Sequence, residues 1–118
     1  MNYSQADATP NDDHILLSIR KGQDLVTQND IPGAERFFLD ALDQLSRAYR
    51  PRVVGFCVAI LPAAWKDEAE DVAQDAFVAA YRNMPRFRGE ASIPTWFFSI
   101  VRKRCFSAIR TFKREEQR

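Results

Sequence analysis

The sequence predicts an all-α protein, a compact bundle of about five helices, because three observations agree. Apolar residues recur at intervals of three and four along most of the chain, the period of a helix with one buried face. No segment alternates apolar and polar residues between hairpin turns, so no strand is expected. Leu, Ile, Val and Phe account for 30 of the 118 residues, enough for one core. We therefore expect one helical domain, over residues 12–112.

The two ends of the chain differ from this domain. Residues 1–11 are polar and lack apolar periodicity, which predicts a mobile tail, and residues 113–118 are predicted to begin a linker. The longest apolar run, 53–61, has nine residues, whereas a membrane-spanning helix needs about 20. The amino terminus also lacks the basic and apolar regions of a secretory signal. The sequence predicts a cytoplasmic protein without membrane insertion.

The first two helices are predicted on either side of a turn. Residues 14–28 carry a weak apolar stripe of Ile15, Leu16, Ile19 and Val26, interrupted by Gly22, and residues 29–33 (Asn-Asp-Ile-Pro-Gly) have the composition of a turn. The segment 34–49 has a strong helical stripe. Its members are Ala34, Phe37, Phe38, Ala41, Leu42, Leu45, Ala48 and Tyr49.

Residues 52–61 form the next helical segment. Because proline fits the first turn of a helix and kinks a helix interior, Pro51 allows either a kinked continuation or a new helix. A further helix is predicted over 67–83, with acidic residues in its first half, where they complement the positive end of the helix dipole. Its stripe consists of Ala69, Val72, Ala73, Ala76, Phe77, Ala80 and Tyr81.

The last predicted helix starts near Ser92 and runs past Ile109. Serine is a favourable N-cap, and Pro94 would occupy the first turn. The stripe of this helix consists of Ile93, Trp96, Phe97, Ile100, Val101, Cys105, Ile109 and Phe112.

Charge is distributed unevenly along the chain. The formal net charge of +1 divides into −6 for residues 1–81 and +7 for residues 82–118. Aromatic side chains are interleaved with the basic residues of the second part, which is the composition of a phosphate-binding surface with stacking platforms. A solvated helix with a core stripe has the same composition, so both interpretations stay open at this point.

The residues of catalytic, metal and cofactor sites are missing from the sequence. The four glycines do not form a phosphate-binding loop, and the single histidine has no partner at metal-ligand spacing. Cys57 and Cys105 lie far apart, without the spacing of a zinc site. The acidic cluster at 67–71 and Asp75 is better explained by helix capping or by docking of a basic partner than by acid–base catalysis. We expect neither an enzyme nor a cofactor.

The most informative stretch runs from Pro85 to Trp96 and leads into the basic helix. Two arginines, an aromatic ring, a glycine and small hydroxyl residues suit a loop that holds phosphates and closes around an unstacked base. Core packing is the alternative for Phe87, Trp96 and Phe97, and Phe106 suits burial and stacking equally. The candidate DNA-binding residues are Arg86, Phe87, Arg88, Gly89, Glu90, Ala91, Ser92, Thr95, Trp96, Ser99, Arg102 and Lys103.

Three sequence motifs in this part of the chain are those of a known family. Residues 70–82 (EDVAQDAFVAAYR), 87–92 (FRGEAS) and 95–96 (TW) closely resemble region 2 of the extracytoplasmic-function (ECF) sigma factors. The resemblance covers roughly residues 65–112, with weaker support back to about residue 34. Residues 21–34 have no counterpart in the motif.

The resemblance implies an all-helical domain of a bacterial transcription initiation factor. Such a domain docks on the clamp helices of the largest subunit of RNA polymerase and captures the non-template strand of the melted minus-ten promoter element. By position, 87–92 matches the loop that holds a flipped promoter base, and 95–103 matches the helix along the minus-ten strand. An anti-sigma inhibitor is implied as a further partner. Asp71, Gln74 and Asp75 match the polymerase-binding face of the family by position, and Glu70 lies beside them and is included with them.

Two further expectations concern the extent of the chain. Family members continue into a helix-turn-helix domain that reads the minus-thirty-five element, and no such segment is visible here, so a fragment is expected. Residues 34–42 also resemble the second helix of a tetratricopeptide unit, so a helical protein-interaction module is the alternative function, although solenoids need about three units.

Overall fold

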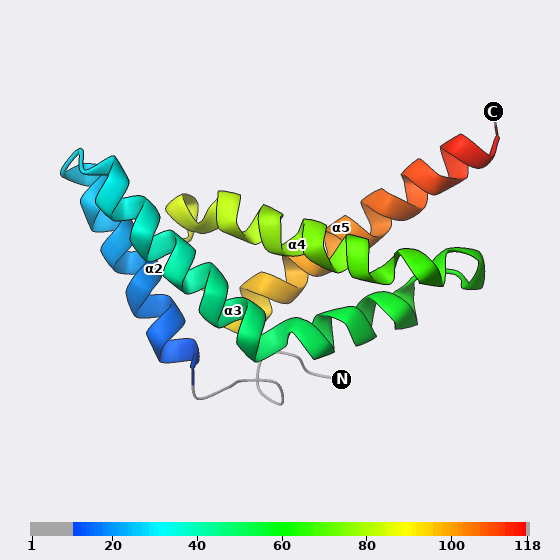
Figure 1. The fold of residues 1–118 in the computed structure, drawn as a ribbon, viewed down its shortest axis with the longest axis horizontal. Coiled ribbons are helices and arrows are strands. Elements are labelled where there is room, and N and C mark those ends of the chain that lie inside the picture. The colour runs from blue at the N-terminus through cyan, green and yellow to red at the C-terminus, as the bar shows by residue number, and fades with distance from the viewer. Residues whose placement is uncertain (1–10, 118) are drawn as a thin grey trace.

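Helices account for nearly all of the part of the chain that the structure describes. A computed structural model describes residues 11–117, and within them the all-α prediction is confirmed, without a strand. The predicted mobile tail lies outside the described residues, apart from Asn11. Figure 1 shows the elements in chain order. They are α2 (Asp12–Thr27), α3 (Ile31–Ile60), the 3₁₀ helix η1 (Ala63–Glu68), α4 (Ala69–Asn83), the 3₁₀ helix η2 (Met84–Arg86) and α5 (Ile93–Glu116).

Helices α2 and α3 form an antiparallel pair joined by a short turn (Figure 1). In the turn, Asp30 caps α3 by accepting a hydrogen bond from the Gly33 amide at 3.1 Å. Gly22 lies in the interface, because a Cβ atom there would stand 2.6 Å from the Phe38 ring. Gly22 therefore extends the buried face of α2 instead of interrupting it. The prediction for Val26 was wrong, since its side chain is exposed.

Polar contacts also fasten α2 to α3. The carboxylate of Asp40 accepts hydrogen bonds from Ser18 Oγ at 2.6 Å and from His14 Nε2 at 2.9 Å. The hydrogen bond from Ser18 favours the charged form and lowers the pKa of Asp40. Further along the pair, the Tyr49 hydroxyl donates to Asp12 at 2.6 Å. These contacts fix the first half of α2 on α3.

Helix α3 continues through Pro51 as one helix of 30 residues. Proline has no N–H for the carbonyl four residues earlier, and its ring crowds that turn, so a kink is expected there. Figure 1 shows α3 bending near its middle. The kinked continuation is thus the correct alternative. The described residues hold four α-helices, fewer than the predicted five, because the segments 34–49 and 52–61 belong to one helix.

The predicted stripes of α3, α4 and α5 meet in one core. The ring of Phe97 is fully buried and lies 5.1 Å from Phe77 of α4 and 6.0 Å from Tyr49 of α3, measured between centroids. The sequence analysis missed Phe98, which is buried next to Tyr49 and Phe56 because α5 contacts α3 as well as α4. Six residues of the α4 stripe are buried. They are Ala69, Val72, Ala73, Ala76, Phe77 and Ala80.

Cys57 and Cys105 bring two free thiols together inside this core. The Sγ atoms of Cys57 and Cys105 share a hydrogen bond at 3.5 Å, between α3 and α5. The hydrogen bond with Cys105 and burial raise the pKa of the Cys57 thiol. Cys57 therefore remains protonated at neutral pH.

The carboxyl-terminal helix is longer than predicted. Helix α5 continues through Glu116, so residues 113–116, which we expected to begin a linker, are helical. The division of the chain at residue 112 stays a prediction. None of the helices within residues 11–117 is long and apolar enough to cross a membrane.

Candidate functional site

The acidic surface of the molecule, defined by Glu70, Asp71, Gln74 and Asp75, lies on the first half of α4. All four side chains are exposed, on the side of α4 opposite its buried stripe. Carboxylates at this position also complement the positive end of the helix dipole, so the charges do not oppose the fold. The acidic surface is available to a basic partner.

Two members of the acidic surface already have partners within the chain. Asp75 Oδ2 accepts hydrogen bonds from Arg104 Nε at 2.7 Å and Nη2 at 2.6 Å, which links α4 to α5. Gln74 Oε1 lies 3.4 Å from Arg50 Nη1 of α3. An exposed ion pair contributes about 0–1 kcal/mol, so these contacts restrict the side chains only weakly. Glu70 and Asp71 have no side-chain partner among the described residues.

Residues 87–92 join η2 to α5 and are anchored at both ends. We call them the promoter loop, because the family resemblance implies that they contact promoter DNA. At one end Phe87 is buried, with its ring centroid 4.9 Å from that of Trp96. At the other end Ser92 caps α5 by accepting from the Thr95 amide at 3.3 Å, and its hydroxyl donates to Thr95 Oγ1 at 3.0 Å. Between them Gly89 adopts a φ of 77°, which glycine reaches without strain.

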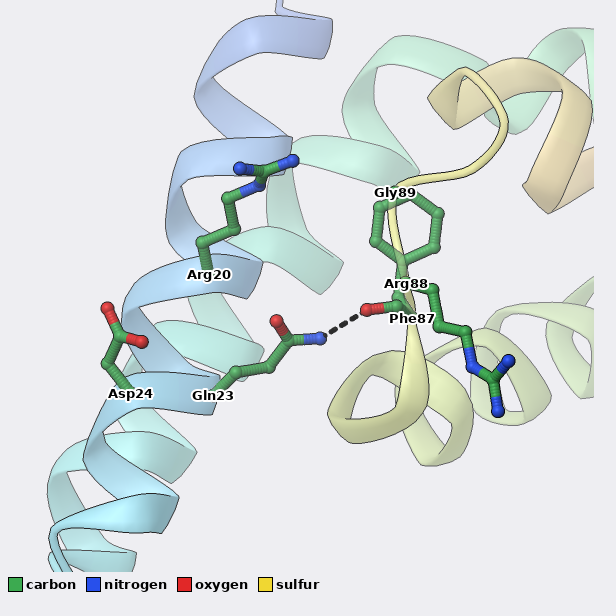
Figure 2. Close-up of a pocket in the computed structure, with 6 residues that line it drawn as sticks. All are labelled: Arg20, Gln23, Asp24, Phe87, Arg88 and Gly89. Carbon is green, nitrogen blue, oxygen red and sulfur yellow. Dashed lines mark hydrogen bonds between the residues drawn. The ribbon is translucent and has the colours of Figure 1, made fainter.

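A glutamine of α2 holds the start of the promoter loop. Gln23 Nε2 donates hydrogen bonds to the carbonyl of Met84 at 3.0 Å and to that of Phe87 at 2.7 Å. Figure 2 shows the second bond reaching from α2 to the loop. The conformation of the loop therefore depends on α2 as well as on α5.

A pocket of about 360 Å³ lies between α2 and the promoter loop. The α2 side carries a cation, an amide and a carboxylate, whereas the other side is formed by the loop (Figure 2). The guanidinium of Arg88 points away from α2 in this view and lies 4.0 Å from Glu90. The lining residues are Arg20, Gln23, Asp24, Phe87, Arg88 and Gly89.

The exposed face of α5 carries further polar and basic side chains beyond the promoter loop. Thr95, Ser99, Arg102 and Lys103 are exposed there, while Trp96 is partly buried. A second pocket of about 310 Å³ lies between α4 and α5, and Asn83 and Arg104 line it together with the predicted residues Trp96, Ser99 and Lys103. This pocket combines amide, hydroxyl and cationic groups with one aromatic ring, which is a composition that suits single-stranded nucleic acid.

The aromatic residues whose role was left open are now placed. Phe97 belongs to the core, and Phe87 is buried, so its ring shapes the promoter loop from inside. Phe106 is 41% exposed, and the Arg102 guanidinium lies 5.6 Å from its ring centroid. Phe106 therefore suits a surface platform better than a core position.

Sequence analysis missed the contribution of α2 to this site. Gln23 stands 61 and 64 residues before its two partners, and a polar residue on a helix gives no sequence signal for contacts with such distant residues. Within residues 11–117, no three His, Cys, Asp or Glu side chains gather closely enough to hold a metal ion.

Comparison with known families places the acidic surface and the promoter loop in context. The sequence model described as Sigma-70 region 2 matches residues 45–115, more than half of the chain. The chain belongs to the sigma-70 region 2 family. The match begins inside α3 and takes in α4, the promoter loop and nearly all of α5, whereas α2 lies outside it. The resemblance noted from the acidic helix and the loop is thereby confirmed.

Curated relatives of the chain carry sigma-factor names. The RNA polymerase sigma-H factor of Pseudomonas aeruginosa is 40% identical over 61 residues, which are 52% of this chain and 31% of that protein. The ECF RNA polymerase sigma factor SigM of Mycobacterium tuberculosis is 32% identical over 73 residues, 62% of this chain and 36% of that protein. The chain thus spans about a third of the length of these relatives. No solved structure matches the chain.

The alternative interpretation, a tetratricopeptide-like module, rested on residues 34–42. In the structure they belong to α3, which pairs with α2. The sequence contains one segment of this kind, and a solenoid needs about three units. Family membership favours the initiation-factor interpretation.

Proposed function

We propose that this chain is a transcription initiation factor domain that docks on RNA polymerase and captures the melted minus-ten strand. One observation carries the proposal: the exposed acidic surface of α4 and the promoter loop belong to the same α4–loop–α5 unit. A unit with an acidic and a basic surface suits a protein that joins two partners of opposite charge. No step requires a catalytic group.

Docking is assigned to the acidic surface and to the clamp helices of the largest polymerase subunit. Opposite charges on two partners speed and orient their encounter. Glu70 and Asp71 are exposed without side-chain partners among the described residues, so they are the groups that a basic partner meets first. An anti-sigma inhibitor stays a prediction from the family resemblance.

Strand capture is assigned to the promoter loop and the exposed face of α5. Arg86 and Arg88 flank the buried Phe87, so their guanidinium groups are exposed for backbone phosphates. Ser99, Arg102 and Lys103 continue the surface along α5. An unstacked base is accessible only in single-stranded or extruded DNA, so we assign melted DNA as the ligand.

The docking assignment is tested with Asp71→Lys. The affinity for purified core polymerase should fall by roughly tenfold or more, mainly through slower association, because a favourable charge is reversed. Asp13→Lys makes the same charge change at an exposed site on α2 and should bind as the unmodified chain does. Asp75 is unsuitable, since a lysine there would also break the pair with Arg104. Equal affinity of a folded Asp71→Lys variant would overturn the docking assignment.

The strand assignment is tested on the polymerase complex. We expect tighter binding to pre-melted minus-ten DNA than to matched duplex. Arg88→Gln and Lys103→Gln should each lower the slope of log affinity against log salt by about 0.7, the value for one single-strand phosphate contact. Arg36→Gln, an exposed neutralisation on α3, is the control. Unchanged slopes in both loop and α5 variants would remove these residues from the DNA path.

A further inference from the structure

Two oppositely charged residues of α2 line the pocket without pairing with each other. Arg20 and Asp24 are one helical turn apart, a spacing at which an arginine and an aspartate usually interact. Both are exposed, yet neither has an ion pair or a side-chain hydrogen bond among the described residues. Both line the pocket, and Figure 2 shows Arg20 above Gln23 on α2, with Asp24 farther from the promoter loop than Gln23. A free donor and a free acceptor therefore border the same pocket.

The guanidinium of Arg20 lies next to Gly89, the residue of the promoter loop that has no side chain. A Cβ atom added to Gly89 would stand 3.0 Å from Arg20 Nη2, which is closer than an ordinary van der Waals contact. The φ of 77° is what favours glycine at this position, and the short distance places Arg20 Nη2 next to Gly89. This approach brings a charged donor of α2 to the backbone of the promoter loop.

Arg20 and Asp24, which form one wall of the pocket, fit a nucleobase better than a phosphate. A phosphate would be attracted by Arg20 but repelled by the Asp24 carboxylate, whereas the edge of a base carries donors and acceptors side by side. Arginine donates two parallel N–H groups to ring nitrogen and carbonyl acceptors, and aspartate accepts from an exocyclic amino group. The pocket volume of about 360 Å³ lies at the lower end of the range for small-ligand sites.

We propose that Arg20 and Asp24 form the second wall of the base pocket and read the edge of an unstacked base that the promoter loop holds. The inference rests on the proposed function, because the loop must first capture melted DNA. The wall favours adenine, cytosine or guanine over thymine, since thymine has no amino group and flanks its single N–H with carbonyl oxygens. Base preference at this position thus comes partly from α2, outside the segment that matches the family.

The experiment selects single-stranded DNA with the complex of this chain and core polymerase. The library carries six randomised positions between constant flanks, and enrichment of each base is sequenced at each position. The unmodified complex should enrich amino-bearing bases at one position. Arg20→Gln and Asp24→Asn should each reduce that preference roughly five- to hundredfold, the range for one base contact, and leave preferences elsewhere unchanged.

Two substitutions provide matched controls. Lys21→Gln removes a positive charge next to Arg20, but Lys21 lies over the Phe37 ring of α3 at 5.6 Å, so base preference should not change. Asp13→Asn is the corresponding control for Asp24. The exposed target residues have no partners among residues 11–117, so the variants should keep their helical content by circular dichroism.

The outcomes separate this inference from the proposed function. If the unmodified complex enriches no base at any position, strand capture itself fails. If it does enrich bases and both variants keep the full preference, Arg20 and Asp24 do not read a base, while the proposed function stands. If Arg20→Gln instead weakens all sequences equally and lowers the salt slope by about 0.7, Arg20 contacts a phosphate, and the base-edge assignment is overturned.

Discussion

The acidic surface and the promoter loop differ in how they depend on the fold. The acidic side chains project from a regular helix whose opposite face forms the core, so the helix does not need them. The promoter loop is part of the packing, because Phe87 is buried, Ser92 caps α5 and Gln23 binds two carbonyls at its start. Substitutions of Glu70 and Asp71 therefore report mainly on binding, whereas substitutions in the loop change stability and binding together.

Phe87→Ala should have the largest effect on stability. Truncating a buried phenylalanine costs about 3–5 kcal/mol, and the lower end applies here because the ring lies at the edge of the core. Urea denaturation followed by circular dichroism measures the change. Minus-ten strand binding should fall with it, since the contact with Trp96 that shapes the loop is lost. A loss below about 1 kcal/mol would show that the loop is independent of the core, contrary to the comparison.

Gln23→Ala should have the next largest effect. The free energy of unfolding should fall by about 1–3 kcal/mol, because two hydrogen bonds to backbone carbonyls are lost. Faster amide hydrogen exchange is expected in the promoter loop, whereas the acidic surface of α4 should keep its protection. Gln44→Ala, at a partly buried site on α3, provides the comparison for simple truncation of a glutamine. Equal exchange in both variants would mean that α2 does not hold the loop.

Ser92→Ala should destabilise the chain by about 1 kcal/mol, because the N-cap of α5 is lost. Ser92→Gly should cost only a few tenths of a kcal/mol, since glycine is tolerated at an N-cap. The two variants separate capping from DNA contact. If the glycine variant is stable yet loses base preference in the selection experiment, the hydroxyl also contacts DNA.

Asp71→Asn should have the smallest effect on stability, within about 0.5 kcal/mol in either direction, as for exposed residues without special contacts. Its affinity for core polymerase should nevertheless fall, and the deficit should shrink as salt screens the interaction. A large loss of stability would show that the acidic surface has a structural role, and the contrast with the loop would disappear.

The sequence was sufficient for features that depend on local periodicity. All but one of the predicted α4 stripe residues are buried, with Tyr81 partly so, because a single face of this helix meets the core. The prediction was weaker where a helix touches several neighbours. Helix α5 contacts α3, α4 and α2, so its buried arc widens and includes Phe98, which lies outside a narrow stripe.

The candidate site likewise contains features that follow from local sequence and features that depend on distant contacts. The exposed acidic residues and the Ser92 cap follow from local pattern, and the structure places them as predicted. The contacts of Gln23 and the approach of Arg20 to Gly89 depend on how α2 sits against a loop more than sixty residues later. The sequence was misleading at Gly22, which we expected to interrupt the apolar stripe. Its lack of a side chain instead allows close packing against Phe38.

Pro51 has a consequence for how the molecule opens. Because it offers no N–H to the Arg47 carbonyl, the ladder of α3 hydrogen bonds has a gap at the bend. Helix α2 and the first half of α3 lie on one side of the gap, and the Cys57–Cys105 contact to α5 lies on the other. We expect the hydrogen-bond ladder of α3 to open more readily at this bend than elsewhere, because one of its hydrogen bonds is missing there. The helix pair that carries Arg20 and Gln23 stays attached to α5 across this bend, because Tyr49 packs against Phe97 and Phe98.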